Sequence, residues 1–392
     1  MSEKICFVVQ RYGLEVNGGA ELLCRLFAEH IKNLYEIEVL TTKAIEYQTW
    51  KDEYKADVEE INGITVRRFG VEHTRGPNFN EINDEFNTIG LPQEREQDWI
   101  DRQGPYAPKL ISYLQGHQND YKVIIFFTYL YYPTVMGIKA VSQKSIVMPF
   151  AHDEPFLKMK IFDDVFLKPN GIVYSTDEEK NLINSKYHNE HIKSTLGGSG
   201  VDLPASVDGE RFKKKYGLEN YIVYVGRIDD GKNCGEMFNF FADYKKRNQN
   251  DIKLVLMGKP VMEIPNNSDI VSLGFVTDED KFDGTAGAKA LWLPSKFESL
   301  SMVVLEAMAV HTNVIVNGEC EVLKGHCLKS NGAFYYNNYF EFEGELNYLL
   351  NPANAETVEQ MKENAKHYVD ENYQWNAITE KLQKLIEEVC GK

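Results

Sequence analysis

Short apolar stretches recur along the chain, and segments with a helical pattern of apolar residues separate them. The stretches are rich in Val, Ile and Phe, and a second series begins at residue 221. Short strands that alternate with helices predict a doubly wound α/β fold, in which helices cover both faces of a parallel sheet. The expected strands lie near residues 4–9, 36–42, 64–69, 123–129, 145–150 and 171–175, and then near 221–225, 252–257, 270–274, 290–293 and 313–316.

The two series predict two Rossmann-like domains that face a cleft. A chain of 392 residues with 43% hydrophobic content is long enough to bury two cores. Glycines are dense between Leu196 and Asp202, which indicates a turn or hinge there. We therefore expect domains at 1–200 and 201–373, followed by a final segment at 374–392. Its helix is predicted over Trp375–Val389 from the apolar spacing.

The net charge of −16 argues against a general nucleic-acid binder and against broad adhesion to anionic lipid. Two basic runs, Lys213–Lys215 and Lys245–Arg247, are expected to be solvated helix faces. The chain begins Met-Ser-Glu-Lys and runs directly into a strand, so no signal peptide is expected. No apolar stretch approaches the roughly 18 residues of a membrane span. These features predict a cytoplasmic protein.

Six cysteines are scattered without a C-x-x-C spacing, so neither a metal site nor a disulfide is expected. Cys6 and Cys24 lie in apolar surroundings and are predicted to be small core residues. The histidines His188, His191, His311 and His326 show no partner pattern that suggests a ligand site.

Two glutamates, Glu298 and Glu306, stand eight positions apart across a predicted helix start. The apolar run 302–309 predicts a buried helix, with Glu298 before it and Glu306 inside it. At about 1.5 Å rise per residue they lie up to roughly 12 Å apart and on different faces. That separation suits the two ends of one extended ligand, although a lone glutamate before a helix is more often a cap or a solvated residue.

Backbone amides lie between the two glutamates, at Ser299, Leu300, Ser301 and Met302. They would meet a phosphate at the positive end of the helix. Upstream, the strand 221–225 ends in Gly226, and Arg227 and Lys232 lie in the connection to the next helix. Loops of this kind line the crevice at the carboxyl edge of an open α/β sheet, where anionic ligands bind. Arginine can fork onto phosphate oxygens there, and lysine supplies a compact charge.

With these motifs, most of the chain resembles a GT-B-fold retaining glycosyltransferase of the family 4 type, also called glycosyl transferases group 1. The resemblance implies that Glu298 contacts the donor sugar and that Glu306 binds the ribose hydroxyls. It implies that Arg227 and Lys232 stabilise the departing diphosphate. The N-terminal domain would bind the acceptor, and the last helix would cross back onto that domain.

The resemblance also concerns the first domain. Gly18 and Gly19 resemble the loop that approaches a phosphate in this family, where a Cβ would hold the backbone away. His152 follows a strand at the point where similar transferases place a histidine against the donor sugar. A lone histidine after a strand is otherwise more often a structural group. Asp153 would orient its ring or cap the next segment.

The implied reaction is sugar transfer from a nucleotide-diphosphate-sugar to a saccharide or lipid-linked saccharide, in bacterial surface polysaccharide or glycoconjugate assembly. Attack from the face of the departing phosphate would retain the anomeric configuration, and that phosphate would take the acceptor proton. No enzymic base, metal or bound cofactor is expected. No Asp-x-Asp stands at a strand end; Asp163-Asp164 and Asp229-Asp230 are adjacent pairs. The expected location is the cytoplasm, with at most peripheral contact at the inner face of the membrane.

Some segments depart from the pattern. Residues 71–120 interrupt the alternation and are expected to be long irregular segments. They would shape the acceptor pocket, although a packing insert specific to a family would look the same. Ser199 replaces the asparagine of the family's Asn-Gly-Val-Asp linker. His311 replaces a common glycine, and Thr312-Asn313 replaces the proline of the following strand.

Three alternatives remain. A nucleotide-sugar epimerase of the same fold would need acid and base residues across the sugar, and no matched set is evident. A dehydrogenase is disfavoured because the first loop, Gln10–Gly19, lacks G-x-G-x-x-G. A catalytically silent nucleotide-sugar-binding protein would keep the same residues, so the sequence leaves it open.

Overall fold

The computed structural model describes residues 3–16, 18–76 and 78–391, and it divides into two compact units. Unit 1 comprises residues up to Ser199 together with those from Trp375 onward, and unit 2 comprises Gly200–Gln374. The division falls inside the glycine-dense stretch, and the last helix belongs to unit 1. Pro77, within the segment 71–120, lies outside the described residues.

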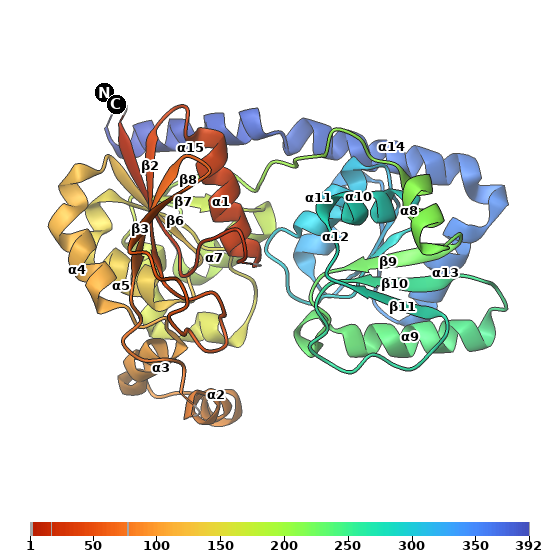
Figure 1. The fold of residues 1–392 in the computed structure, drawn as a ribbon, viewed down its shortest axis with the longest axis horizontal. Coiled ribbons are helices and arrows are strands. Elements are labelled where there is room, and N and C mark those ends of the chain that lie inside the picture. Colours follow the sequence, from red (N-terminus) through yellow and green to blue (C-terminus); the bar gives the residue numbers. More distant parts are fainter. Residues whose placement is uncertain (1–2, 17, 77, 392) are drawn as a thin grey trace. The chain divides into compact units, whose positions relative to one another are not determined.

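Unit 1 contains an eight-stranded sheet, shown in Figure 1. Every neighbouring pair is parallel except β3 and β4, which form an antiparallel edge. In spatial order its strands are β3 (Val58–Ile61), β4 (Ile64–Phe69), β2 (Glu36–Thr42), β1 (Lys4–Val8), β5 (Val123–Phe127), β6 (Ser145–Met148), β7 (Gly171–Tyr174) and β8 (Lys193–Leu196).

The α-helices of unit 1 lie between these strands and after the last of them along the chain. They are α1 (Gly19–Ile31), α2 (Asn78–Ile89), α3 (Glu96–Gln103), α4 (Pro108–His117), α5 (Tyr132–Val141), α6 (Asp163–Leu167), α7 (Asp177–Tyr187) and α15 (Trp375–Val389). Short 3₁₀ turns lie at Gln93–Arg95, Gln118–Asp120, Ser142–Lys144, Pro155–Lys158 and Lys160–Phe162.

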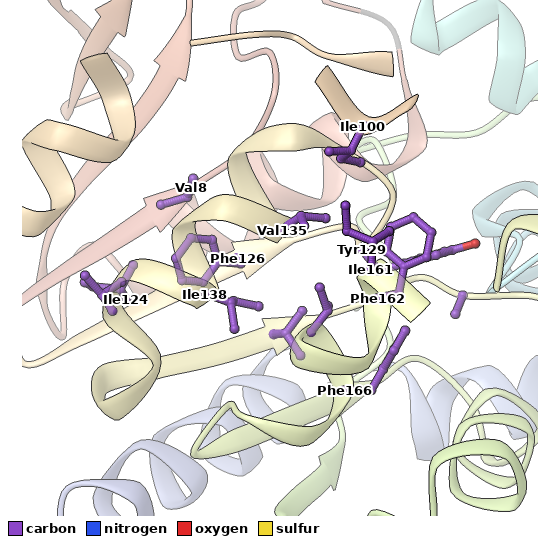
Figure 2. Packing of buried hydrophobic residues seen from close by; sticks show 14 of the residues in the cluster. Val8, Ile100, Ile124, Phe126, Tyr129, Val135, Ile138, Ile161, Phe162 and Phe166 are labelled. Carbon is purple, nitrogen blue, oxygen red and sulfur yellow. The ribbon is translucent and has the colours of Figure 1, made fainter. Parts of the chain in front are cut away.

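Two apolar layers enclose the sheet of unit 1, because successive side chains of a strand point to opposite faces. On β1, Ile5 and Phe7 belong to one buried apolar cluster with residues of α1 and α15, whereas Cys6 and Val8 belong to another with residues of α4 to α7. Figure 2 shows the second layer, with Val8 and Phe126 from the sheet beside Val135 and Ile138 of α5. The near-continuous apolar strands follow from this double burial.

Unit 2 contains a six-stranded sheet in which every neighbouring pair is parallel. In spatial order its strands are β11 (Ile270–Gly274), β10 (Lys253–Met257), β9 (Tyr221–Val225), β12 (Leu291–Leu293), β13 (Val314–Asn317) and β14 (Phe334–Tyr336). Its helices are α8 (Gly209–Tyr216), α9 (Cys234–Arg247), α10 (Asp278–Gly287), α11 (Met302–Ala309), α12 (Glu321–Ser330), α13 (Tyr339–Leu350) and α14 (Ala355–Asn372), with 3₁₀ turns at Asp230–Lys232 and Pro352–Asn354.

The predicted fold class is confirmed, since both units are Rossmann-like parallel sheets with helices between the strands. Helices α11 and α15 begin and end at the predicted residues. Three short strands, β3, β8 and β14, were not predicted. Residues 71–120 are not long irregular loops, because helices α2, α3 and α4 occupy most of that segment.

The six cysteines are free thiols, and Cys6 and Cys24 are fully buried in the core, as predicted. No helix within the described ranges combines the length and the apolar character that crossing a bilayer requires.

Candidate functional site

Unit 2 has a topological switch point between β9 and β12. From β9 the chain moves to β10 and β11 on one side of the sheet, and β12 leads to β13 and β14 on the other. The loops after β9 and β12 therefore diverge at the carboxyl edge of the sheet, which is where open α/β folds bind ligands. The predicted motifs occupy these two loops, at residues 226–233 and 294–301.

The loop after β9 begins with a close backbone contact. The amide of Gly226 donates to the carbonyl of Met257 at 2.9 Å. A Cβ on Gly258 would lie 1.8 Å from the carbonyl oxygen of Gly226, so no side chain fits there. Gly226 and Gly258 also have φ of +149° and +151°, which L-residues rarely adopt.

We expect Gly258→Ala to destabilise the protein by about 1–3 kcal/mol from backbone strain alone, and to displace the loop that carries Arg227 and Lys232. Chemical denaturation would measure the change. Gly344→Ala is the matched control, because a Cβ on this helical glycine meets nothing within 4 Å. The control should gain about 0.5–1 kcal/mol; equal effects at the two positions would contradict the prediction.

Asp229 organises the two cationic residues of this loop. Its carboxylate accepts from the backbone amide of Lys232 at 2.9 Å and from Nε of Arg227. The Tyr224 hydroxyl donates to the carbonyl of Arg227 at 2.6 Å. The Arg227 side chain is 44% exposed, whereas that of Lys232 is 29% exposed. The two cations therefore differ, since Arg227 pairs with Asp229 inside its own loop and Lys232 reaches the neighbouring loop.

Lys232 and Glu298 meet across the switch point. The Lys232 ammonium lies 2.6 Å from the Glu298 carboxylate, and the Glu298 side chain is 13% exposed. This contact joins the loops after β9 and β12, and it shows that the two sequence motifs converge. The pair neutralises itself in the absence of a ligand.

Amide side chains fasten the same loops. The side-chain amides of Asn233 and Asn317 each donate to the carbonyl of Pro294 at 3.2 Å. Both also approach the carboxylate of Glu236, at 2.8 and 3.5 Å respectively. Since Asn317 ends β13, this clamp holds three consecutive loops at the carboxyl edge.

Helix α11 begins with backbone amides that have no acceptor. Glu298 precedes the helix and Glu306 lies inside it, as predicted. Within the described part of the chain, no hydrogen bond is made by the amides of Ser301, Met302 and Val303. Ser301 has φ of +66° and caps the helix without a side-chain hydrogen bond. Unpaired amides at the positive end of a helix form an anion site.

The peptide between Leu300 and Ser301 is held by His326 on α12. Nε2 of His326 lies 2.7 Å from the carbonyl of Leu300 and must donate to it, because a carbonyl only accepts. Nδ1 lies 3.0 Å from the hydroxyl of Tyr368, which lies 3.0 Å from that of Tyr373. In a trans peptide the C=O and N–H point in opposite directions. The Ser301 amide is therefore turned away from His326.

Replacing His326 with Leu would leave the buried Leu300 carbonyl without its donor. We expect this variant to lose about 1–3 kcal/mol of unfolding free energy, the cost of a buried unsatisfied group. His326→Gln keeps a donor near the position of Nε2 and should recover most of the loss. Urea denaturation of the two variants measures the difference, and equal losses would show that the hydrogen bond contributes little.

Glu306 pairs with Lys281 of α10, at 2.9 Å between carboxylate and ammonium. Burial raises the pKa of Glu306, and the nearby Lys281 ammonium opposes that rise. Its side chain is 13% exposed, so a ligand hydroxyl that reached it would compete with Lys281 rather than with bulk water.

The predicted glycine loop in unit 1 serves a charged pair. A Cβ on Gly18 would lie 2.2 Å from a carboxylate oxygen of Glu21 and 3.0 Å from Nη2 of Arg11. Arg11 and Glu21 form a buried ion pair at 2.5 Å. Gly18 thus makes room for these side chains, whereas a Cβ on Gly19 would meet nothing within 4 Å.

His152 lies after β6 in a turn that Glu154 closes. The Glu154 amide donates to the His152 carbonyl at 2.8 Å, and the Glu154 carboxylate lies 3.8 Å from Nε2 of His152. The Tyr129 hydroxyl donates to the same carboxylate at 2.5 Å. The Glu154 carboxylate is therefore a partner of the His152 ring that the sequence did not indicate.

Beneath this turn, Glu179 accepts from the amides of Ala151 and Ser175 at 2.5 and 2.6 Å. Burial raises the pKa of Glu179 from 4.5 to about 8, although these amides oppose the rise.

Because the folded protein retains this proton after the unfolded chain has lost it, the unfolding free energy should fall as pH rises from about 4.5 to about 8. Glu179→Gln removes that titration, so its stability should depend less on pH over the same interval. Denaturation at several pH values compares the two slopes. Parallel curves for wild type and variant would contradict the assignment.

His311 has acidic partners that the sequence did not indicate. Its Nε2 lies 3.1 Å from Glu363 and 3.7 Å from Glu359 of α14. The three side chains bring ligand-type atoms within 4.8 Å of one another on the surface, so they could hold a cation.

The sequence identified the residues of the two loops but missed their partners. These partners are distant from the motifs in the sequence. Lys281 is 25 residues from Glu306, His326 is 26 residues from Leu300, and Asn317 is 23 residues from Pro294. No local pattern of charge or spacing distinguishes them, because only the packing of α10, α12 and β13 brings them to the loops.

Known proteins share this architecture. The family model for glycosyl transferases group 1 matches residues 208–368, which lie in unit 2 and include the site. No curated protein sequence matches the chain.

Solved structures match the whole length of the chain. A sucrose-phosphate synthase from Thermosynechococcus elongatus has a TM-score of 0.72 at 15% identity, over 99% of each chain. HepE of Anabaena, in complex with UDP and glucose, has a TM-score of 0.70 at 14% identity, over 98% of this chain and 100% of its own. WaaG, a glycosyltransferase involved in lipopolysaccharide biosynthesis, has a TM-score of 0.67 at 13% identity, over 99% of this chain and 100% of its own. The fold is therefore that of GT-B glycosyltransferases.

Proposed function

We propose that the chain is a retaining glycosyltransferase of the family 4 type that takes its sugar from a nucleotide-diphosphate-sugar. The observation that carries the proposal is the group of amides without acceptors at Ser301, Met302 and Val303. They stand at a switch point beside two lysine–glutamate pairs. The match of residues 208–368 to glycosyl transferases group 1 supports the same reading.

The donor diphosphate would lie against these amides. Negative charge grows on the departing phosphate as the anomeric bond breaks, and fixed donors stabilise that charge without reorganising. Lys232 would shift from Glu298 to a phosphate oxygen, and Arg227 would shift from Asp229 to a phosphate oxygen. Because His326 fixes the Leu300–Ser301 peptide, one donor would be oriented before the donor substrate binds.

The glutamates would bind the two ends of the donor. Glu298, released from Lys232, would accept a hydrogen bond from a sugar hydroxyl. Glu306 would accept from the ribose hydroxyls while Lys281 balances its charge. His152, Gly18 and Gly19 of unit 1 are proposed to contact the donor as well. The acceptor hydroxyl would attack from the side of the departing phosphate, which would take its proton, so no enzymic base or metal is invoked.

HepE is known in complexes with UDP and with UDP-glucose, so we infer that UDP-glucose is a suitable first donor for this chain. WaaG is a glycosyltransferase involved in lipopolysaccharide biosynthesis. By analogy we propose that this chain uses a saccharide or lipid-linked saccharide acceptor in surface polysaccharide assembly, at the cytoplasmic side of a membrane.

Thermal shift with UDP, GDP and ADP tests the donor site. A nucleotide at 100 times its dissociation constant should add about 2.7 kcal/mol of stability to the wild type. We expect one base class to do so and Glu306→Ala to abolish the effect. Glu321→Gln is the control, since that side chain is 75% exposed near the start of α12. Equal shifts in wild type and Glu306→Ala would remove ribose recognition from Glu306.

Release of the nucleoside diphosphate from its sugar conjugate tests turnover. Lys232→Gln should lower kcat by roughly 10²- to 10³-fold, the usual effect of removing one electrostatic donor. Nucleotide binding without turnover by the wild type, across a broad set of acceptors, would instead indicate a silent binding protein.

A further inference from the structure

Unit 1 also has a switch point, between β1 and β5, and four neighbouring loops meet there. In the sheet the strands run β4, β2, β1 and β5. The loop after each strand carries one residue of interest: Arg75 after β4, Trp50 after β2, Arg11 after β1 and Tyr131 after β5. The Arg75 and Arg11 guanidiniums both lie over the Trp50 ring, at 5.2 and 6.0 Å, and the Tyr131 ring lies 5.4 Å from it.

The Arg75 guanidinium is fixed by uncharged groups. Nη2 donates to the Gln103 carbonyl at 2.8 Å and to the Gln103 side-chain oxygen at 2.7 Å. The Phe79 ring lies 4.4 Å away on a second side. The indole of Trp50 also donates to the Gln103 carbonyl, at 2.7 Å. These contacts hold the guanidinium in one orientation.

Arg75 differs from the other arginines of unit 1 in its charge balance. Six arginines of this unit have a carboxylate oxygen within 4.0 Å, namely Arg11, Arg25, Arg67, Arg68, Arg95 and Arg102. Among the described residues, Arg75 has no carboxylate partner. Burial lowers the pKa of Arg75, which reflects a cation that has lost water without gaining an anion.

One nitrogen of Arg75 remains accessible. Nε is enclosed without an acceptor and Nη2 is engaged by Gln103, whereas Nη1 makes no hydrogen bond to the described residues and is not enclosed. The side chain as a whole is partly exposed. The Tyr131 hydroxyl is likewise neither enclosed nor hydrogen-bonded within the described ranges. An arriving ligand would find one cationic donor and one hydroxyl.

We propose that Arg75 binds an anionic group, a phosphate or a carboxylate, on the acceptor saccharide. This inference rests on the proposed function, in which the donor diphosphate occupies unit 2 and the acceptor occupies unit 1. A charged acceptor supplies the anion that Arg75 lacks, and Tyr131 adds a hydrogen bond to the same ligand. Arg11 does not serve this role, because Glu21 already neutralises it.

Calorimetric titration in saturating UDP tests the proposal, because UDP occupies the anion site of unit 2. The probes are glucose 6-phosphate, glucuronate, glucose and inorganic phosphate. We expect the wild type to bind at least one of the two charged sugars ten times or more tightly than glucose. Arg75→Gln should weaken that binding tenfold or more, and Arg75→Lys should weaken it less.

Arg102→Gln is the matched control, since it removes the same charge from a pair with Asp98 in the same unit. It should bind the charged sugar as the wild type does. Unchanged affinity in Arg75→Gln would overturn the proposal. So would equal binding of glucose and both charged sugars by the wild type, a comparison that needs no variant to fold. Binding of inorganic phosphate alone would indicate a free-anion site and would also overturn it.

Loss of UDP affinity in Arg75→Gln would assign Arg75 to the donor and overturn the acceptor role. The proposed function fails separately, because it predicts UDP binding that depends on Glu306. A wild type that binds charged sugars through Arg75 but no nucleotide would keep the anion site and refute the donor site.

Discussion

The reversal of strand order between β9 and β12 is the constraint on which the site depends. It separates the loops after these strands at the carboxyl edge of the sheet, and the chain then reconnects them through side chains. The contact between Lys232 and Glu298 and the Asn233–Pro294–Asn317 clamp perform that connection. The amides at the start of α11, which have no acceptor among the described residues, follow the loop that these contacts hold.

Much of the fold could be predicted because the buried parallel strands are near-continuous apolar segments and helix α11 is apolar apart from Glu306. Residues 71–120 were wrongly predicted to be irregular, because their helices are short, at 12, 8 and 10 residues. The strands β3, β8 and β14 lie at sheet edges and are only partly buried, so they lack the fully buried apolar pattern of the central strands. For the site, glutamates beside a helix start were recognisable from spacing, whereas Lys281 and His326 depend on tertiary packing alone.

Charge is balanced differently around Lys232 and Lys281 of unit 2 and around Arg75 of unit 1. In unit 2 the cations Lys232 and Lys281 lie against carboxylates that have their own proposed roles, so ligand binding exchanges partners instead of exposing new charge. In unit 1, Arg75 is held by carbonyl oxygens and aromatic rings. The first arrangement suits a ligand that brings both hydroxyls and phosphates, and the second suits one that brings an anion.

The contact between the ends of β9 and β10 limits how this site can vary. Gly258 abuts a carbonyl oxygen of Gly226, which belongs to the main chain and is present whatever side chain stands at position 226. At a crowded core position, a larger residue can often be accommodated by a smaller side chain at a neighbouring position. At position 258 this is not possible. Suppressor mutations of such a change would have to move the strand itself.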